Sequence, residues 1–253
     1  MTEPTILKLG GSVITDKDSP ETVDDASLKG VLDAVETAYK NHDGELQLVI
    51  VHGGGSFGHV HAAEHGVSTT SGTSEAAAAA AIHGSMKQLN GVVLDGLQDR
   101  GIDALPVHPM SAAARDERGE LSLPATVTAS LLAEGFVPVL HGDVITHAGE
   151  GLTVLSGDEI VTSLADSLGA SRVGLCSTVP GVLDETDAVI DEITDFGDVA
   201  AVLGDSDATD VSGGMAGKVH ELLALGAPAH IFGPDAAGAF LAGGEPGTRI
   251  DGR

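Results

Sequence analysis

The chain has 253 residues and a formal net charge of -26, so it is long enough to bury a core, as one large domain or two closely joined lobes. Its acidic residues are spread along the sequence and indicate a solvated surface that repels nucleic acid and anionic membranes, so neither is an expected partner. This charge leads to the hypothesis of a salt-loaded cytoplasm, as in extreme halophiles, because the Debye length shrinks to roughly 3 Å at 1 M salt and screens the repulsion between acidic residues.

Cysteine content and the N-terminus narrow the class of protein further. Cys176 is the single cysteine, which permits no intramolecular disulfide, and no Cys/His cluster has zinc-binding spacing. Residues 1–4 lead directly into an apolar run without the basic region of a signal peptide. No apolar run approaches the roughly 20 residues that span a bilayer. The sequence therefore predicts a cytoplasmic protein.

Short β-branched runs alternate with Ala- and Leu-rich stretches along the chain. In chain order, the pattern predicts a strand over 5–9, a helix over 24–40, a strand over 46–52, a long helix over 74–99, a loop over 106–124 and a strand over 136–140. A hairpin over 144–155 follows, then a helix over 157–168, a strand over 172–176, an extended hairpin segment over 184–193, a helix over 212–225 and strands over 228–232 and 248–250. This alternation predicts an α/β fold with an open, mainly parallel β-sheet sandwiched by helices.

Two glycine-rich loops follow the first two predicted strands, KLGGS at 8–12 and HGGGSFGH at 52–59. The glycines of each loop have two interpretations: they form a tight strand-to-helix turn, or they allow the backbone to approach a ligand closely. Two such loops at the carboxyl ends of parallel strands favour a ligand site. Three of the six lysines, Lys8, Lys17 and Lys218, lie in or beside glycine-rich segments. Cations next to unhindered backbone N–H groups are typical of a polyphosphate site.

These motifs occur in order with LSGDEIV at 155–161 and DVSGGMAGK at 210–218. In this combination the chain, from residue 6 to about residue 250, resembles the amino-acid kinase superfamily and, within it, the isopentenyl phosphate kinases of archaeal type. The segment FGH at 57–59 is the narrower marker, shared mainly with members that phosphorylate a phosphate or phosphonate.

The resemblance implies ATP-dependent phosphorylation of isopentenyl phosphate to isopentenyl diphosphate in the isoprenoid pathway. It implies ATP and Mg²⁺ as cofactors, the Mg²⁺ being carried by ATP phosphates and water, because no Asp/Glu triad marks a protein metal site. It also implies a homodimer and one domain over 1–253, with the acceptor site and dimer contacts in an N-terminal lobe of about 1–150 and the nucleotide site in a C-terminal lobe of about 151–253.

The resemblance also assigns catalytic roles. Lys8 and Lys218 would hold the nucleotide phosphates, Lys17 would approach the γ-phosphate and acceptor, Asp158 would orient the lysines, and His59 would donate to the acceptor phosphate. The residues alone also allow structural roles for three of these side chains. His59 could be a surface histidine, Lys17 a solvated loop residue and Asp158 an acid in the first turn of a helix. A buried unpaired Lys8 would be costly, so this lysine is expected to have an anionic partner.

The further residues implied to bind ATP are Gly10, Gly11, Ser12, Gly55, Thr178, Val182, Asp184 and Gly214, and those implied to bind the acceptor with His59 are Gly54 and Gly142. Thr178 replaces an aspartate common in this family motif, which leaves the adenine and ribose contacts open.

Two questions stay open at this point. Ile82, Met86 and Val93 of the long predicted helix either form an apolar pocket for a five-carbon tail or pack the core. The alternative functions are another small phosphate-, phosphonate- or carboxylate-accepting kinase, and a non-catalytic nucleotide-binding sensor.

Overall fold

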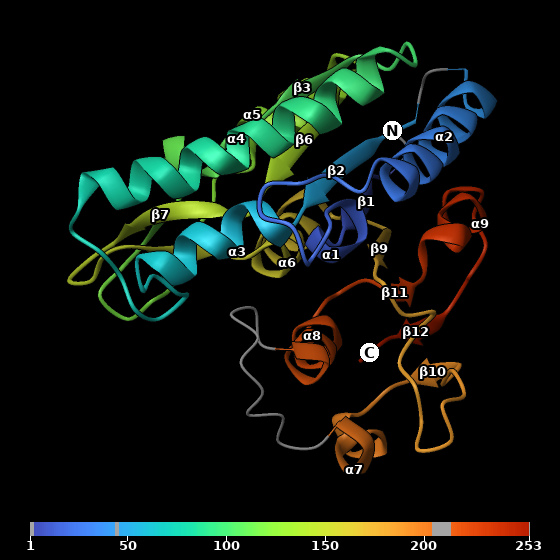
Figure 1. Cartoon of the computed structure of the whole chain (residues 1–253). Helices are drawn as coiled ribbons and strands as arrows, with labels where there is room; N and C mark the ends of the chain where they lie inside the picture. Colours follow the sequence, from blue (N-terminus) through green and yellow to red (C-terminus); the bar gives the residue numbers. More distant parts are fainter. Residues whose placement is uncertain (1–2, 44–45, 204–213, 253) are drawn as a thin grey trace.

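The computed structural model describes residues 3–43, 46–203 and 214–252, and it is built around an eight-stranded open sheet (Figure 1). The strand order is β10-β12-β11-β9-β1-β2-β6-β3, and all neighbours are parallel except β11 and β12. This confirms the predicted α/β class with a mainly parallel sheet. These strands are β1 (Thr5–Leu9), β2 (Leu48–His52), β3 (Ala104–Pro106), β6 (Val137–His141), β9 (Arg172–Cys176), β10 (Glu192–Ile193), β11 (Ala229–Phe232) and β12 (Thr248–Ile250).

Helices cover both faces of this sheet, and on each face a cluster of buried apolar side chains packs between the helices and the strands. On one face lie α2 (Asp25–Asn41), α4 (Ala76–Gln98) and α9 (Ala237–Leu241); on the other lie α5 (Thr126–Ala133), α6 (Gly157–Leu168) and α8 (Gly214–Leu223). Shorter helices are α1 (Gly11–Ile14), α3 (Gly55–Glu64) and α7 (Ala200–Leu203).

The central strand β1 shows how alternation positions the site. Its side chains point to opposite faces in turn, so Leu7 and Leu9 join the cluster under α2, whereas Ile6 joins the cluster under α6. Lys8 therefore falls on the face that α6 covers, although its neighbours along the strand are fully buried apolar residues. The same alternation that buries the strand thus directs one cation toward the start of α6.

The prediction of a loop over 106–124 is wrong. It contains a 3₁₀ turn (Pro109–Ser111) and two short strands, β4 (Ala114–Arg115) and β5 (Leu121–Ser122). These strands extend the correctly predicted hairpin of β7 (Asp143–His147) and β8 (Gly151–Leu155) into a second sheet with the order β5-β4-β7-β8. Strands of two residues are too short to carry a periodic signal. They form through pairing, β4 with β7 and β5 with β4.

Two other predictions need comment: one segment differs from the structure, and the other begins at residues that the structure does not describe. The expected extended hairpin over 184–193 forms only the bridge between Leu183 and Val189 and the two-residue strand β10, which pairs in parallel with β12. The predicted helix over 212–225 is present as α8, and its expected first residues, Ser212 and Gly213, lie outside the described residues.

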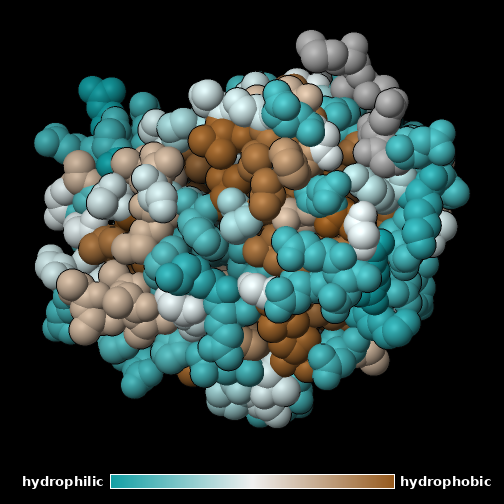
Figure 2. Space-filling model, turned by 90° about the horizontal axis from the view of Figure 1, so that it is seen from above, coloured by the Kyte–Doolittle hydropathy of each residue, from teal (hydrophilic) through white to brown (hydrophobic). Residues whose placement is uncertain are grey.

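The net charge of -26 predicts a largely hydrophilic surface. The face seen in Figure 2 carries hydrophilic residues over most of its area, with apolar residues gathered in a few patches. Among the described residues, the large apolar side chains that are exposed are Val60, Val92 and Val127.

Raising KCl from about 0.1 M to about 2 M is expected to raise the thermal unfolding midpoint, because screening reduces repulsion between the surface carboxylates. Thermal melts followed by circular dichroism across a KCl series measure this shift, with sucrose as a control for nonspecific exclusion. A midpoint that stays constant from low to molar KCl contradicts the hypothesis of a salt-adapted protein.

Candidate active site

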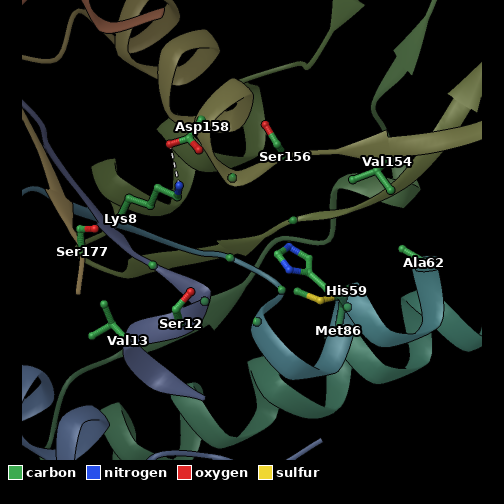
Figure 3. Close-up of a pocket in the computed structure, with 18 of the residues that line it drawn as sticks. Lys8, Ser12, Val13, His59, Ala62, Met86, Val154, Ser156, Asp158 and Ser177 are labelled. Atoms are coloured by element: carbon green, nitrogen blue, oxygen red, sulfur yellow. Dashed lines mark hydrogen bonds and ion pairs between the residues drawn. The ribbon is translucent and has the colours of Figure 1, made fainter. Parts of the chain in front are cut away.

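A cavity of about 300 Å³ opens at the carboxyl ends of β1 and β2 (Figure 3). The two glycine loops form one side of it, and the first turn of α6 forms another. Most residues that the sequence predicted for the site line this cavity: Lys8, Gly10, Gly11, Ser12, Lys17, Gly54, Gly55, His59, Gly142, Asp158, Thr178 and Lys218.

Lys8 and Asp158 form a buried ion pair at the cavity wall. The Lys8 Nζ atom donates to the Asp158 Oδ1 atom at 2.6 Å, and both side chains are less than one-tenth exposed. Lys218 Nζ lies 3.8 Å from the other oxygen, Oδ2. A single carboxylate thus holds two cations beside the cavity, and this arrangement offsets the cost of burying Lys8. Lys8 has the anionic partner that the sequence predicted.

The first turn of α6 fixes the position of Asp158. Ser156 is the helix N-cap, its Oγ accepts from the Glu159 N–H at 3.2 Å, and Glu159 Oε2 accepts from the Ser156 N–H at 2.9 Å. The Arg115 guanidinium donates to the other Glu159 oxygen at 2.6 Å. This capping box satisfies two helix-end donors reciprocally. Asp158 itself is a first-turn acid, in the region that favours negative charge.

The two glycine loops touch each other through their backbones. A Cβ on Gly11 would overlap the backbone nitrogen of Gly55, and one on Gly53 would lie 2.8 Å from the Gly11 nitrogen. Gly55 also has a φ of 48°, in the left-handed region. Because side chains would force these loops apart, glycine at these positions brings the backbone N–H groups of both loops to one cavity.

Gly11→Ala is expected to lower the free energy of unfolding by about 1–3 kcal/mol, as overpacking of a close-packed contact does. It should also weaken ATP binding, because the loops can no longer approach each other. Gly30→Ala is the control: a Cβ there meets no atom within 4 Å, and removing a mid-helix glycine should stabilise α2 by about 0.5–1 kcal/mol. Urea unfolding and ATP titration measure both effects; equal stabilities for the two variants would contradict this account.

The opposite end of the cavity combines one histidine with an apolar wall. His59 is exposed, lies on α3 and lines the cavity together with Ala62, Ile82, Met86 and Val154. In the view of Figure 3, His59 lies between the Lys8–Asp158 pair and the side chains of Ala62, Met86 and Val154. The cavity therefore has the Lys8–Asp158 ion pair at one end and an apolar wall at the other. The second glycine loop reaches this wall, since a Cβ on Gly58 would lie 2.7 Å from the Met86 sulfur.

Four predicted residues do not reach the cavity wall. Val182 is buried in the core beneath α6 and α8, and Asp184 accepts from Thr186 and Ala188 N–H groups within its own exposed turn. Gly214 begins α8 and accepts from Lys218 Nζ at 3.4 Å. Val93 belongs to the core between α4 and the sheet, so only Ile82 and Met86 of the proposed tail residues line the cavity.

Glu221 on α8 is a site neighbour that sequence reasoning missed. Burial, and then the charges of Asp158 and Glu159, raise its pKa to about 7, although Lys8 and Lys218 oppose this shift. Its Oε2 atom is buried and has no hydrogen-bond partner among the described residues. No sequence signal identified it, because its environment comes from α6, which is distant in the chain.

Glu221→Gln is expected to raise the unfolding midpoint at about pH 8 and to change it much less at about pH 5. Because the pKa of Glu221 is higher in the folded than in the unfolded protein, its protonated carboxyl stabilises the fold at a pH below the unfolded pKa near 4.5. This stabilisation is lost as the pH rises through the folded pKa of about 7. Thermal melts across this range measure the difference, with the exposed Glu117→Gln variant as the control. A constant difference between Glu221→Gln and the parent protein at all pH values would contradict the assignment.

The described part of the chain contains neither a metal-binding cluster nor a membrane-spanning helix. No group of three or more His, Cys, Asp or Glu side chains in that part of the chain is arranged to hold a metal ion. None of its helices is long and apolar enough to cross a membrane.

Comparisons with known proteins agree with this geometry. The model of the amino acid kinase family matches residues 3–232. An isopentenyl phosphate kinase of Haloferax volcanii is 62% identical over 247 residues, which cover 98% of each chain. One of Methanocaldococcus jannaschii is 30% identical over 98% of each chain. A solved isopentenyl phosphate kinase structure, 31% identical, superposes with a TM-score of 0.82 and covers 97% of this chain and 99% of that one. On this evidence the chain belongs to the amino acid kinase family.

Proposed function

We propose that this protein transfers the γ-phosphoryl group of ATP to isopentenyl phosphate and releases isopentenyl diphosphate. The observation that carries the proposal is one cavity lined by three lysines and two glycine loops, with the Lys8–Asp158 pair at one end and His59 beside an apolar wall at the other. An acceptor with a phosphate head and a short hydrocarbon tail matches both ends. The name of the Haloferax volcanii relative, at 62% identity, supports the same substrate.

The chain's own residues supply positioning and charge. Phosphoryl transfer needs little covalent help from the protein, and catalysis consists mainly of alignment and stabilisation of negative charge. Lys8 and Lys218, held by Asp158, face the nucleotide phosphates together with the backbone of Gly11 and Gly55. Mg²⁺ would neutralise charge on ATP; the described residues offer it no carboxylate cluster, so ATP phosphates and water would carry it.

Acceptor orientation comes from the other end of the cavity. His59 donates a hydrogen bond to the acceptor phosphate and keeps one phosphate oxygen in line with the γ-phosphorus. Ala62, Ile82, Met86 and Val154 receive the hydrocarbon tail, and burying it favours this orientation by about 0.8 kcal/mol per CH₂ group. A carboxylate acceptor would leave both His59 and this apolar wall without a role.

Single-turnover transfer from γ-labelled ATP at molar KCl tests the function. Isopentenyl phosphate is expected to accept the label, whereas glutamate, carbamate and short alkyl phosphonates should accept it far more slowly. Transfer to one of those acceptors instead would replace the substrate assignment. ATP binding without transfer to any acceptor would support a nucleotide sensor.

The quaternary and cellular assignments belong to the same proposal. The homodimer would form through the N-terminal half, which carries the exposed Val60 and Val92 on the adjacent helices α3 and α4. The N-terminal lobe, about residues 1–150, would hold the acceptor and the C-terminal lobe, about 151–253, the nucleotide. The acidic surface supports a cytoplasmic location with high salt. Light scattering of the protein at molar KCl tests the dimer directly.

A further inference from the structure

Two fully buried histidines end neighbouring strands directly behind the cavity. His52 is the last residue of β2 and His141 the last of β6; they are paired in register, and their rings stack with centroids 5.6 Å apart. Each is followed by a glycine that lines the cavity, Gly53 and Gly142. The histidines themselves do not line it, so neither is expected to contact the substrates.

Each imidazole contacts the carbonyl oxygen of the glycine that follows it. The Nδ1 atom of His52 lies 3.1 Å from the Gly53 oxygen, and Nδ1 of His141 lies 2.9 Å from the Gly142 oxygen. A carbonyl oxygen only accepts, so both contacts require a proton on Nδ1. Asp143 is a weaker candidate partner for His141, because its nearest oxygen lies 3.9 Å from Nδ1 and its carboxylate is held by His83 at 2.9 Å.

The other ring nitrogens then have to accept hydrogen bonds. Burial lowers the pKa of His52 to about 4 and that of His141 well below its usual value, so each neutral ring carries one proton. His141 Nε2 lies 2.8 Å from His108 Nδ1, which can donate to it. His52 Nε2 lies 3.1 Å from the Asn90 side-chain amide.

The Asn90 amide satisfies the same requirement when its NH₂ group faces the His52 ring. With its oxygen toward the ring, Nδ2 is buried and has no partner among the described residues. With Nδ2 toward the ring, the amide donates to Nε2 of His52, so the buried donor gains an acceptor. His52 and His141 thus share one pattern: Nδ1–H donates to the next glycine, and Nε2 accepts from a neighbour.

We propose that His52 and His141 are positioning residues, which as Nδ1–H tautomers hold the Gly53 and Gly142 carbonyls and so orient the backbone that faces the acceptor. In a trans peptide the N–H points opposite to the C=O. Holding the Gly53 oxygen toward His52 turns the Gly54 N–H away from that ring. His141 in the same way fixes the turn at Gly142 between β6 and β7. The inference rests on the proposed function only in placing the acceptor beside Gly54 and Gly142.

Long-range proton–nitrogen NMR of the full chain, labelled with ¹⁵N-histidine, reads the tautomers directly. Two buried histidines, assigned by the loss of their signals in His52→Asn and His141→Asn, are expected to carry their proton on Nδ1 near neutral pH. An Nε2–H tautomer or a doubly protonated ring at either position overturns the proposal. This readout does not depend on catalysis, so it stands or falls separately from the substrate assignment.

A matched pair of variants tests the consequence for catalysis. Asn and Leu have similar shapes, but only Asn offers a side-chain N–H near the position of Nδ1. His52→Leu is expected to lower kcat/KM for isopentenyl phosphate by about tenfold to a hundredfold, mainly through KM, with the KM for ATP nearly unchanged. His52→Asn should restore most of this loss. His141→Leu and His141→Asn should behave in the same way.

His230→Leu is the control, because His230 is also a buried strand histidine, on β11 away from the cavity. It should leave the acceptor KM unchanged. Equal losses for His52→Leu and His52→Asn, or a loss confined to the KM for ATP, would overturn the positioning role. If the Leu variants do not fold, the tautomers measured in the parent protein decide the question.

Discussion

Replacing Lys8 with Met is expected to lower the single-turnover rate of phosphoryl transfer by about a hundredfold to a thousandfold, the usual effect of removing one preorganised electrostatic contact. The Lys8 ammonium is buried at the cavity wall and held at 2.6 Å by Asp158, so water cannot replace its charge. Rapid-quench measurement with γ-labelled ATP gives the rate. Lys29→Met, which removes an exposed lysine on α2, is the control and should retain the parent rate.

The same substitution should also affect stability, because it leaves the Asp158 carboxylate buried beside Lys218 alone. Breaking a buried ion pair at one partner costs about 3–5 kcal/mol, and Lys218 at 3.8 Å should offset part of this cost. The double variant Lys8→Met, Asp158→Leu is therefore expected to recover stability in urea unfolding but not activity. A parent-like rate in either variant would remove Lys8 from the catalytic residues.

His59→Ala is expected to raise the KM for isopentenyl phosphate and to lower kcat, for a combined loss of about tenfold to a hundredfold, as for a hydrogen bond to a charged group. ATP affinity should change little, because the lysines and the backbone of the glycine loops hold the nucleotide. His59→Gln and His59→Asn should recover part of the activity, since an amide N–H can donate to the same oxygen.

His61→Ala is the matched control on the same helix. His61 Nε2 contacts the Glu21 carboxylate at 2.9 Å and does not line the cavity. Steady-state kinetics with each substrate varied in turn separates the two effects. Parent-like kinetics for His59→Ala would place the acceptor phosphate elsewhere and would remove the main support for a phosphate acceptor.

The sequence alone predicted the fold class, and most of the site residues that it indicated line the cavity. Strands 5–9 and 172–176 were predicted with their observed bounds, because buried parallel strands are short, mainly apolar and bounded by glycines or turns. The glycine loops were recognisable because close backbone approach excludes side chains, as the contact between Gly11 and Gly55 confirms. These features depend on local chemistry, so they are visible along the chain.

Tertiary structure decided which groups meet. Lys8 and Asp158 are 150 positions apart, and their ion pair depends on the alternation of β1 and on α6 lying over that face. Glu221 acquires its raised pKa, and His52 and His141 their shared geometry, only when separate elements are brought together. Likewise, β4 and β5 exist because β7 pairs with β4. Sequence periodicity shows which face of a helix or strand is apolar. Strand order and helix placement determine which elements that face contacts, and the burial and charge pairing of its side chains follow from those contacts.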